Sequence, residues 1–454
     1  MNILFENPDK VNGKLTLTIE EADYTQEVEK TLKDYRKKAN IPGFRPGQAP
    51  MGMIKRQFGP SVKVDVINRV LGEQLQKYIT DNNVHMLGEP LANEGQEPVD
   101  LDKEAPYTFV FDIAVAPEFN AQLGADDTVD YYNITVDDAL IDRQVDMFAS
   151  RSGKYEKAEE YQDNDMLKGD LRELDENGNT KEGGLVVEAA VLMPNYIKVD
   201  EQKKLFDGAK LGDIITFNPR KAYPESDVEL SSFLKIGKED VANHTGDFSY
   251  QITEISRYQK AAVDQQLFDS VFGEGAVSSE EEFRNKIADG LAAQLTVDAD
   301  YKFLLDVRAY VENKVGELTF PDALLKRIML KNNEDKGEEF VEKNYAASIK
   351  ELAWSLIKNQ LVEAAGIKLE QDDVLQAAKE TARIQFAQYG MNNVPDEYVE
   401  NYAKEILKKQ ENVQGCVDRA LDIKLVAALK SVVKLNEKSI SLDDFNAMMS
   451  KKEA

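Results

Sequence analysis

The spacing of apolar residues changes twice along the chain, and each change marks a different kind of domain. Near the start, Leu15, Leu17 and Ile19 alternate with polar residues, which is the period of a half-buried strand, and helical spacing follows. Short strand-like runs separated by turns begin at about residue 153, and helical spacing prevails after residue 258. Because 454 residues exceed what one hydrophobic core supports, these patterns predict separate domains. The expected fold class is multidomain α+β.

Proline and glycine breaks set the expected domain boundaries. We predict four segments: an α+β domain at 1–118, a polar connector with one helix at 119–152, a β-rich domain at 153–257 and an all-α domain at 258–454. Pro60 and Ser61 are the expected start of the second helix, because proline interrupts a helix interior and serine caps an N-terminus. Asn177 and Gly178 indicate a hairpin turn, and Ser441 is the expected start of the last helix.

Composition excludes several classes of function. The formal net charge is −27, so general affinity for DNA is not expected. The two histidines, His85 and His244, have no histidine or cysteine at metal-ligand spacing. The sequence also contains no phosphate-binding loop, dinucleotide fingerprint or nucleophile elbow. We therefore expect no metal and no cofactor, and the single cysteine, Cys416, is expected to be a buried thiol.

The expected location is the cytoplasm. No stretch reaches the run of about 18 apolar residues that a membrane span needs, so no membrane contact is predicted. Glu6 and Pro8 interrupt the N-terminus before the apolar core of a signal peptide could form.

Residues 30–77 carry a positive charge that opposes the rest of the chain. The window holds eleven bases against three acids, which leaves a net charge of +8. Such an island can orient an acidic protein on a polyanion, although most charge runs are solvated helix faces, and both readings stay open. It surrounds a glycine- and proline-rich loop at 43–50, where Arg45 can reach a phosphate. Phe44 either packs the loop onto its domain or anchors a partner.

The run Ile41-Pro42-Gly43-Phe44-Arg45-Pro46-Gly47-Gln48-Ala49-Pro50 resembles the ribosome-docking loop of the trigger factor family, Gly-Phe-Arg-x-Gly-x-x-Pro. Segments 15–20, 107–119 and 264–273 and the order of the domains also resemble that family, so the resemblance covers essentially the whole chain. It implies ribosome contacts from the loop and nearby bases: Gly43, Phe44, Arg45, Gly47, Pro50, Lys37 and Lys38. Pro46 replaces a lysine of well-known members, which implies weaker docking; Lys37, Lys38, Lys55 and Arg56 are the expected compensating bases.

The same resemblance implies an FK506-binding-protein-like middle domain with prolyl isomerase activity. Ala222-Tyr223-Pro224 resembles the Ala-Tyr-Gly segment of that fold, so Tyr223 is the first candidate pocket residue. The further candidates are Phe217, Phe248 and Tyr250. However, the usual Ile-Pro-Gly pocket floor and Asp-Phe pair do not occur at 193–199 and 183–186. Whether the domain is an isomerase or a degenerate relic is left open.

In the all-α segment the resemblance implies helical arms that hold unfolded clients. The candidate contact residues are Trp354, Leu356, Ile357, Leu361, Val362, Ile384, Phe386, Tyr389, Met391, Met448 and Met449, each of which could instead be inter-helix core. The predicted function is an ATP-independent chaperone that binds nascent chains at the ribosome. The alternatives are a ribosome-independent chaperone or assembly factor and an active prolyl isomerase. Exposed apolar arms would also favour self-association, so a homodimer is left open.

Overall fold

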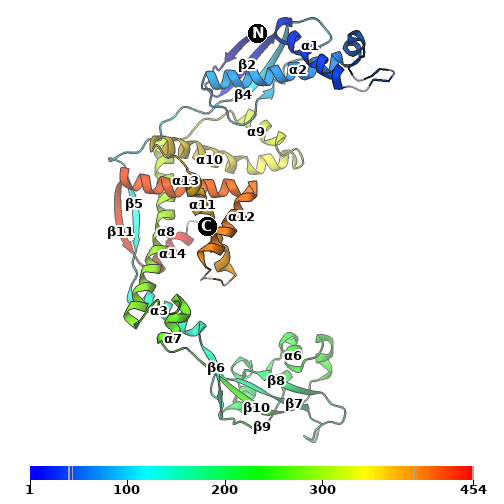
Figure 1. Cartoon of the computed structure of the whole chain (residues 1–454). Helices are drawn as coiled ribbons and strands as arrows, with labels where there is room; N and C mark the ends of the chain where they lie inside the picture. The colour runs from blue at the N-terminus through cyan, green and yellow to red at the C-terminus, as the bar shows by residue number, and fades with distance from the viewer. Residues whose placement is uncertain (39–40, 43, 46, 390, 392–393, 452–454) are drawn as a thin grey trace. The chain divides into compact units, whose positions relative to one another are not determined.

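The computed structural model describes residues 1–38, 41–42, 44–45, 47–389, 391 and 394–451 (Figure 1). Contacts within the chain divide it into two units, each assembled from separate stretches of sequence. The first unit joins Met1–Tyr131 to Asp300–Lys438, and the second joins Tyr132–Ala299 to the segment from Ser439 onward. The predicted fold class, multidomain α+β, is confirmed.

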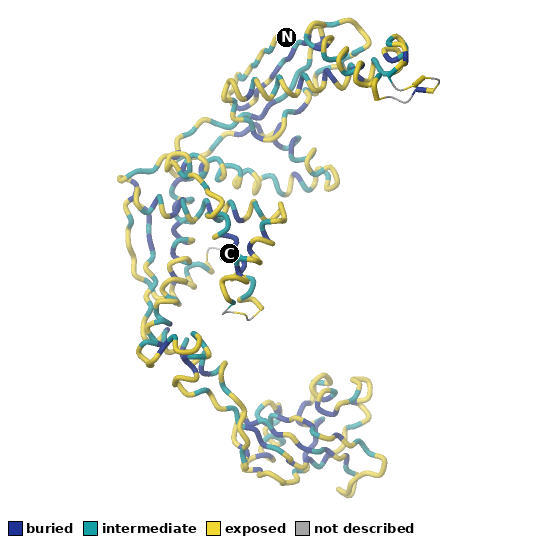
Figure 2. Tube along the Cα trace, in the orientation of Figure 1, coloured by how far each residue is buried: buried dark blue, intermediate teal, exposed yellow. Residues whose placement is uncertain are grey.

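The first unit begins with a four-stranded antiparallel sheet and two helices. The sheet order is β1 (Asn2–Glu6), β2 (Asn12–Ile19), β4 (Tyr107–Ala114) and β3 (Leu91–Ala92). Leu15, Leu17 and Ile19 point into a core shared with α1 (Glu21–Lys38) and α2 (Met51–Asp81). The alternation predicted from the sequence is therefore confirmed, and Figure 2 shows the buried positions recurring along these strands and α2.

The predicted helix start at Pro60 and Ser61 is wrong. Helix α2 continues from Met51 to Asp81 with Pro60 inside it, and the Ser61 hydroxyl donates to the Phe58 carbonyl at 3.1 Å. A proline at this position cannot donate the amide hydrogen bond to the carbonyl four residues earlier. Ile54 before the proline and Val62 after it are both buried in one core, so tertiary packing outweighs the local penalty.

The helical part of the first unit contains the second half of α8 (Glu280–Val315) and five further helices. These are α9 (Asp322–Lys331), α10 (Gly337–Ala364), α11 (Gln371–Gln388), α12 (Asp396–Lys408) and α13 (Gln410–Val432). Helices α9 and α10 pack against Leu87, Leu91 and Ala114 of the N-terminal part. Helices α11, α12 and α13 share a separate small-residue core that includes Ala378, Ala403 and the buried thiol of Cys416.

The second unit is built around the β-rich middle domain. Its sheet has the order β6 (Lys154–Ala158), β10 (Phe248–Gln259), β7 (Met166–Glu173) and β8 (Val186–Leu192), and β9 (Ile214–Phe217) also pairs with β10. The helices are α3 (Asp138–Arg151), α4 (Asp200–Lys203), α5 (Pro219–Ala222), α6 (Asp227–Leu234), α7 (Gln265–Phe272), the first half of α8 and α14 (Leu442–Ser450). The predicted turn at Gly178, with φ +80°, and the predicted cap at Ser441 are confirmed.

Two strands lie where the sequence predicted none. β5 (Thr128–Ile134) begins in the supposed polar connector and pairs with β11 (Lys434–Ile440), which interrupts the supposedly all-helical segment. Each strand is short, and its pairing partner is about 300 residues away, so no local pattern reveals the pair. Among the described residues, no helix is both long and apolar enough to cross a membrane.

Candidate functional site

The loop predicted to dock on the ribosome is fixed at both ends and exposed at its tip. Ile41 and Ala49 are buried, and the Gly47 amide donates to the Arg36 carbonyl at 3.1 Å. Gly47 has φ +83°, a conformation that favours glycine. Phe44 is 37% exposed and Arg45 is also exposed, so the aromatic ring is available to a partner. Gly43 and Pro46 lie outside the described residues.

The eleven bases of residues 30–77 form the basic island. Some of them make ion pairs with carboxylates, and the others do not. Lys37 pairs with Asp34 at 2.9 Å, and Lys55 pairs with Glu29 at 3.3 Å. Arg69 and Lys30 both contact Glu27, at 2.7 and 3.6 Å, and the hydrogen bond from Arg69 is the main cause that lowers the pKa of that carboxyl. Glu27 and Glu29 lie just before the window 30–77, so counting charges within that window missed them. Two of the four predicted compensating bases are therefore already paired.

Seven of the eleven bases make no ion pair with any residue in the described ranges; Arg36 and Lys63 are half-buried, and the other five lie on the surface. These five are Lys33, Lys38, Arg45, Arg56 and Lys77. Lys38 ends α1 just before the loop, and Arg56 lies on the first turns of α2 just after it. The loop therefore has an unpaired cation at its tip and one on each side. This arrangement suits phosphate groups on a partner.

The four candidate pocket residues of the middle domain come together in its core. Tyr223, Phe217, Phe248 and Tyr250 are each at most 7% exposed. The Phe217 and Tyr250 ring centroids are 6.3 Å apart, and the Tyr250 hydroxyl donates to the Ala190 carbonyl at 2.9 Å. Burial raises the pKa of Tyr223 to about 12. These side chains fill space between the sheet and its helices, so in this conformation they present little aromatic surface to a substrate.

Sequence analysis missed two further rings of this cluster, Phe206 and Phe233. Phe206 packs 5.2 Å from Phe217, and Phe233 packs 6.0 Å from it, measured between ring centroids. The signal for Phe233 was available, because Leu230, Phe233 and Leu234 share one face of α6. Together these rings form a closed aromatic layer.

The proposed client-contact residues separate into core and surface. Ile357 and Leu361 are buried between helices, and Trp354, Leu356, Val362, Met448 and Met449 are half-buried. In contrast, Ile384, Tyr389 and Met391 are exposed, and Tyr389 is 82% exposed. A hollow of about 650 Å³ lies beside them on the α11–α12 hairpin. Phe386, Met391, Val394, Tyr398 and Tyr402 supply its apolar lining.

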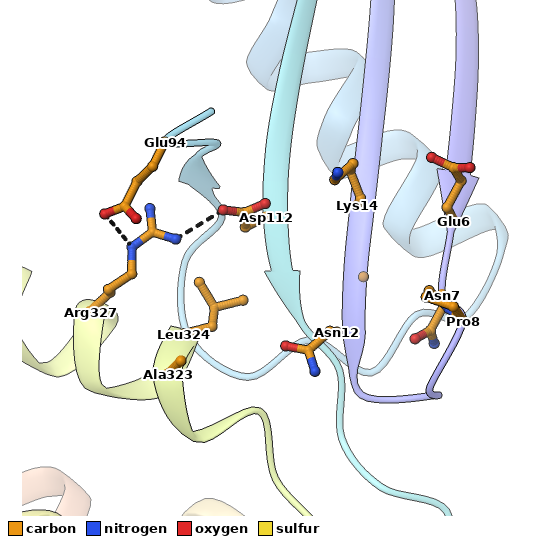
Figure 3. A pocket seen from close by; sticks show the side chains of 11 residues that line it. Glu6, Asn7, Pro8, Asn12, Lys14, Glu94, Asp112, Ala323, Leu324 and Arg327 are labelled. Atoms are coloured by element: carbon orange, nitrogen blue, oxygen red, sulfur yellow. Dashed lines mark hydrogen bonds and ion pairs between the residues drawn. The ribbon is translucent and has the colours of Figure 1, made fainter. Parts of the chain in front are cut away.

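A second hollow, of about 710 Å³, lies where the N-terminal sheet meets α9 (Figure 3). Arg327 binds the Glu94 carboxylate through Nε at 3.0 Å and the Asp112 carboxylate through Nη1 at 2.9 Å. Lys14 of β2 and Glu6 of β1 also line this hollow. These mixed charges favour neither anions nor cations, so the arrangement acts as a link between sheet and helix. Within the described ranges, no group of three or more His, Cys, Asp or Glu residues could hold a metal ion.

Comparison with known proteins assigns all three parts of the chain. The family model "Bacterial trigger factor protein (TF)" matches residues 1–148, and "Probable trigger factor, FKBP-like domain" matches residues 155–260. A third model, "Probable trigger factor, C-terminal domain", matches residues 299–449. The chain belongs to the trigger factor family. The predicted family and the FKBP-like fold of the middle domain are confirmed.

Individual trigger factors resemble the chain at low identity. The Trigger factor of Bordetella avium is 29% identical over 60% of this chain, and the match spans 59% of that relative's length. The Trigger factor of Pseudomonas fluorescens strain Pf-5 is 23% identical over 84% of this chain and 96% of its own. A solved structure described as "Promiscuous Substrate Recognition in Folding and Assembly Activities of the Trigger Factor Chaperone" matches with a TM-score of 0.51. It is 15% identical and covers 95% of this chain and 99% of that chain, which shows a shared fold.

Each of the three matching family models covers one of the candidate sites. The exposed loop lies within residues 1–148, the aromatic layer within 155–260, and the α11–α12 hollow within 299–449. The residue roles predicted from the trigger factor resemblance, including those of Lys37 and Lys38, stay predictions.

Proposed function

We propose that this member of the trigger factor family is an ATP-independent chaperone that binds nascent polypeptides at the ribosomal exit tunnel, in the cytoplasm. One observation carries the proposal: Phe44 and Arg45 are exposed at the tip of a loop whose flanking residues Ile41 and Ala49 are buried. A loop fixed in this way loses little conformational entropy when its tip binds.

The charges around the loop support docking on a polyanion in one orientation. Lys38, Arg45 and Arg56 are unpaired within the described ranges, whereas the chain as a whole carries −27. Ribosomal RNA would attract the tip and repel most of the remaining surface. Phe44 would supply the apolar contact that fixes the position.

The exposed side chains of the α11–α12 hairpin support the chaperone part of the proposal. Ile384, Tyr389, Met391 and Tyr398 are each at least 46% exposed and lie on one helical hairpin. Apolar and aromatic surface of this kind can hold unfolded segments through many weak contacts without an energy source.

Co-sedimentation with ribosomes tests the docking site. Replacing Phe44 and Arg45 together by alanine is expected to weaken pelleting by at least about 30-fold, because an interface anchor contributes about 2 kcal/mol or more. Neighbours on α2 provide a matched control: Arg56→Ala should weaken binding, whereas Lys55→Ala should have little effect because Lys55 already pairs with Glu29. Equal pelleting of the double variant and the wild type would exclude this loop as the docking site.

A prolyl isomerase is the second candidate function, and the match of residues 155–260 to an FKBP-like domain favours it. The aromatic layer around Tyr250 is closed and buried, so we expect slow turnover of a proline substrate. A chaperone that works away from the ribosome is the remaining alternative. In that case the wild type would suppress aggregation of unfolded proteins but would not pellet with ribosomes.

A further inference from the structure

Helix α6 covers part of the aromatic layer of the middle domain, and one side chain makes most of the cover. The Phe233 ring lies 6.0 Å from the Phe217 ring and 6.2 Å from the Tyr250 ring, measured between centroids. Phe233 is buried on the inner face of α6, whereas Val228 on the same helix is 59% exposed. The helix therefore packs on the layer with one face and meets solvent with the other.

Few contacts besides this packing hold α6 on the domain. Within the described ranges, α6 makes no backbone hydrogen bond to the sheet. It has eight residues, and an isolated helix of that length is at best marginally stable in water, so its folding depends on packing. In contrast, β7 and β10 are each paired with strands on both sides. The helix can therefore leave the layer without breaking the sheet.

An exposed lysine ties the C-terminal end of α6 to the edge strand β8, which lies beside it (Figure 1). The Lys235 ammonium donates to the Glu188 carbonyl at 2.7 Å and to the Ala189 carbonyl at 3.4 Å. Both carbonyls lie at a β-bulge, where two residues of β8 oppose one residue of β7. Lys235 and Ala189 have φ +53° and +51°, which is uncommon for residues other than glycine. The closed arrangement therefore contains two strained backbone positions, one at each end of this link.

The N-terminal end of α6 follows directly on Tyr223, the first candidate pocket residue. Tyr223 lies at the C-terminal end of α5, and residues 224–226 connect it to α6. The Ser226 hydroxyl accepts a hydrogen bond from the Glu229 amide at 3.4 Å, which is long for such a bond. A short connection with a weak cap is a suitable hinge for the helix.

Two tyrosine hydroxyl groups in this core have no hydrogen-bond partner among the described residues. They belong to Tyr161 and Tyr223, which are 5% and 7% exposed. A buried hydroxyl without a partner is uncommon in folded proteins. The Tyr223 hydroxyl, next to the connection that leads to α6, is therefore available to donate to a carbonyl oxygen of a ligand.

We propose that α6 is an autoinhibitory plug of a site for prolyl peptides, and that Phe233 occupies the space on Phe217 and Tyr250 that a proline ring takes when α6 is displaced. The amide before proline has no N–H, so an apolar aromatic layer leaves no donor of that bond unpaired. An apolar environment also stabilises the charge-separated resonance form of the amide less than water does, which eases rotation about the bond.

The inference rests on prolyl isomerisation, the second candidate function proposed above, and it adds the regulation of that site. It also gives a physical reason for slow turnover by the wild type. The rate is scaled by the fraction of molecules in which α6 is displaced, and the closed form contributes nothing.

Isomerisation of a short proline peptide by the full chain tests the plug. Phe233→Ala removes the covering ring and is expected to raise turnover at least about tenfold, because losing a buried aromatic ring shifts an equilibrium by more than that factor. Phe206→Ala is the matched control, because Phe206 is an equal ring 5.2 Å from Phe217 but does not belong to α6. This control should give no increase. Adding Tyr223→Phe to Phe233→Ala should lower the raised turnover about fivefold, because the donor to the substrate is lost.

Lys235→Met is a second variant that leaves the buried layer intact, because Lys235 is exposed. Loss of its hydrogen bonds to β8 should raise turnover about fivefold. Lys238→Met removes the same charge three residues later, from an exposed side chain without a partner in the described ranges. It should leave turnover within about twofold of the wild type.

Hydrogen exchange of the same full-length variants measures displacement of α6 independently of activity. In Phe233→Ala the α6 amides should exchange faster, while the β7 and β10 amides keep their wild-type protection. If β7 and β10 lose protection as well, Phe233 supports the whole core and α6 is not a separate plug. An equal gain of turnover in Phe206→Ala would likewise refute the plug.

The outcomes also separate the plug from the isomerase function on which it rests. If the wild type already turns over rapidly and Phe233→Ala is no faster, the plug alone is overturned. If α6 opens in Phe233→Ala but turnover stays at the uncatalysed rate, the isomerase function fails and the plug fails with it.

Discussion

At the scale of single residues, burial and pairing decide which charges are available. Glu173 of β7 is a buried carboxylate that accepts hydrogen bonds from the Leu185 amide at 3.0 Å and from Lys181 at 2.7 Å, and His244 lies 3.0 Å from it. Burial alone would raise its pKa, but these partners together hold the pKa below its ordinary value of 4.5. The carboxylate therefore stabilises the folded middle domain above about pH 4.5, and this contribution is lost as the pH falls through the lowered pKa.

Glu173→Gln should consequently destabilise the middle domain by roughly 1–3 kcal/mol at pH 7, because hydrogen bonds to a charged acceptor are lost. Hydrogen exchange of the β7 and β8 amides in the full chain measures the effect locally. The stability difference between variant and wild type should shrink as the pH falls from about 4.5 through the lowered pKa of Glu173, because the wild-type carboxyl then also becomes protonated. A difference that is constant from pH 7 to pH 3 would show that the charge of Glu173 is not responsible.

The residue types of the loop predicted its exposure, but they did not predict which of the nearby bases form ion pairs. The glycine, proline and aromatic composition of 43–50 correctly indicated that Phe44 and Arg45 are exposed, because glycine and proline act locally. The pairing of Lys55 with Glu29 joins two helices and depends on their packing, so no pattern within either helix could reveal it. For the same reason the closure of the aromatic layer around Phe217 could not be read from the sequence.

At the scale of helices and strands, Pro60 is the clearest conflict between local preference and packing. Proline in a helix interior costs about 3 kcal/mol, yet α2 continues through it. Pro60→Ala is expected to raise the stability of the N-terminal domain by about 1–3 kcal/mol, by restoring a helical hydrogen bond to the Arg56 carbonyl. Thermal unfolding of the full chain, followed by hydrogen exchange in α2, measures this. A loss of stability would mean that the packing of Ile54 and Val62 requires the local backbone geometry that proline imposes.

Elements with a strong internal period were predictable, and elements defined by a distant partner were not. The helices from α8 to α13 and the strand β2 follow from apolar spacing. Strands β5 and β11 depend on each other across the chain, and the edge strand β1 has only five residues. The apolar alternation within each of these strands is too short to be distinguished from the polar sequence around it.

The middle domain gives a further prediction at the element scale. Since Tyr223 and Tyr250 are buried beneath α6 and its neighbours, the full chain should catalyse cis/trans exchange of a proline peptide weakly, within about tenfold of the uncatalysed rate. A protease-coupled or magnetisation-exchange assay measures the rate. Fast turnover that Tyr223→Phe reduces would show that the aromatic layer opens and that the domain is an active isomerase.

At the scale of the whole molecule, an acidic chain carries a small cationic surface, which in the proposed docking would select one orientation. Among the described residues, Lys38, Arg45 and Arg56 make no ion pair; Arg45 lies at the tip of the loop and the other two lie on either side of it, on a protein with a net charge of −27. If these three contact RNA phosphates, the logarithm of the ribosome-binding constant should fall with the logarithm of salt concentration with a slope of about −2 to −3. Pelleting over a series of potassium chloride concentrations gives this slope.

The double variant Arg45→Ala/Arg56→Ala should reduce the steepness of that slope by about 1.5 to 2, whereas Lys37→Ala/Lys55→Ala should leave it within about 0.5 of the wild type. The second pair removes the same charge, but Asp34 and Glu29 already engage those lysines. If net charge alone governed the encounter, both double variants would change the slope equally. The comparison therefore separates specific phosphate contacts from the general electrostatic field of the molecule.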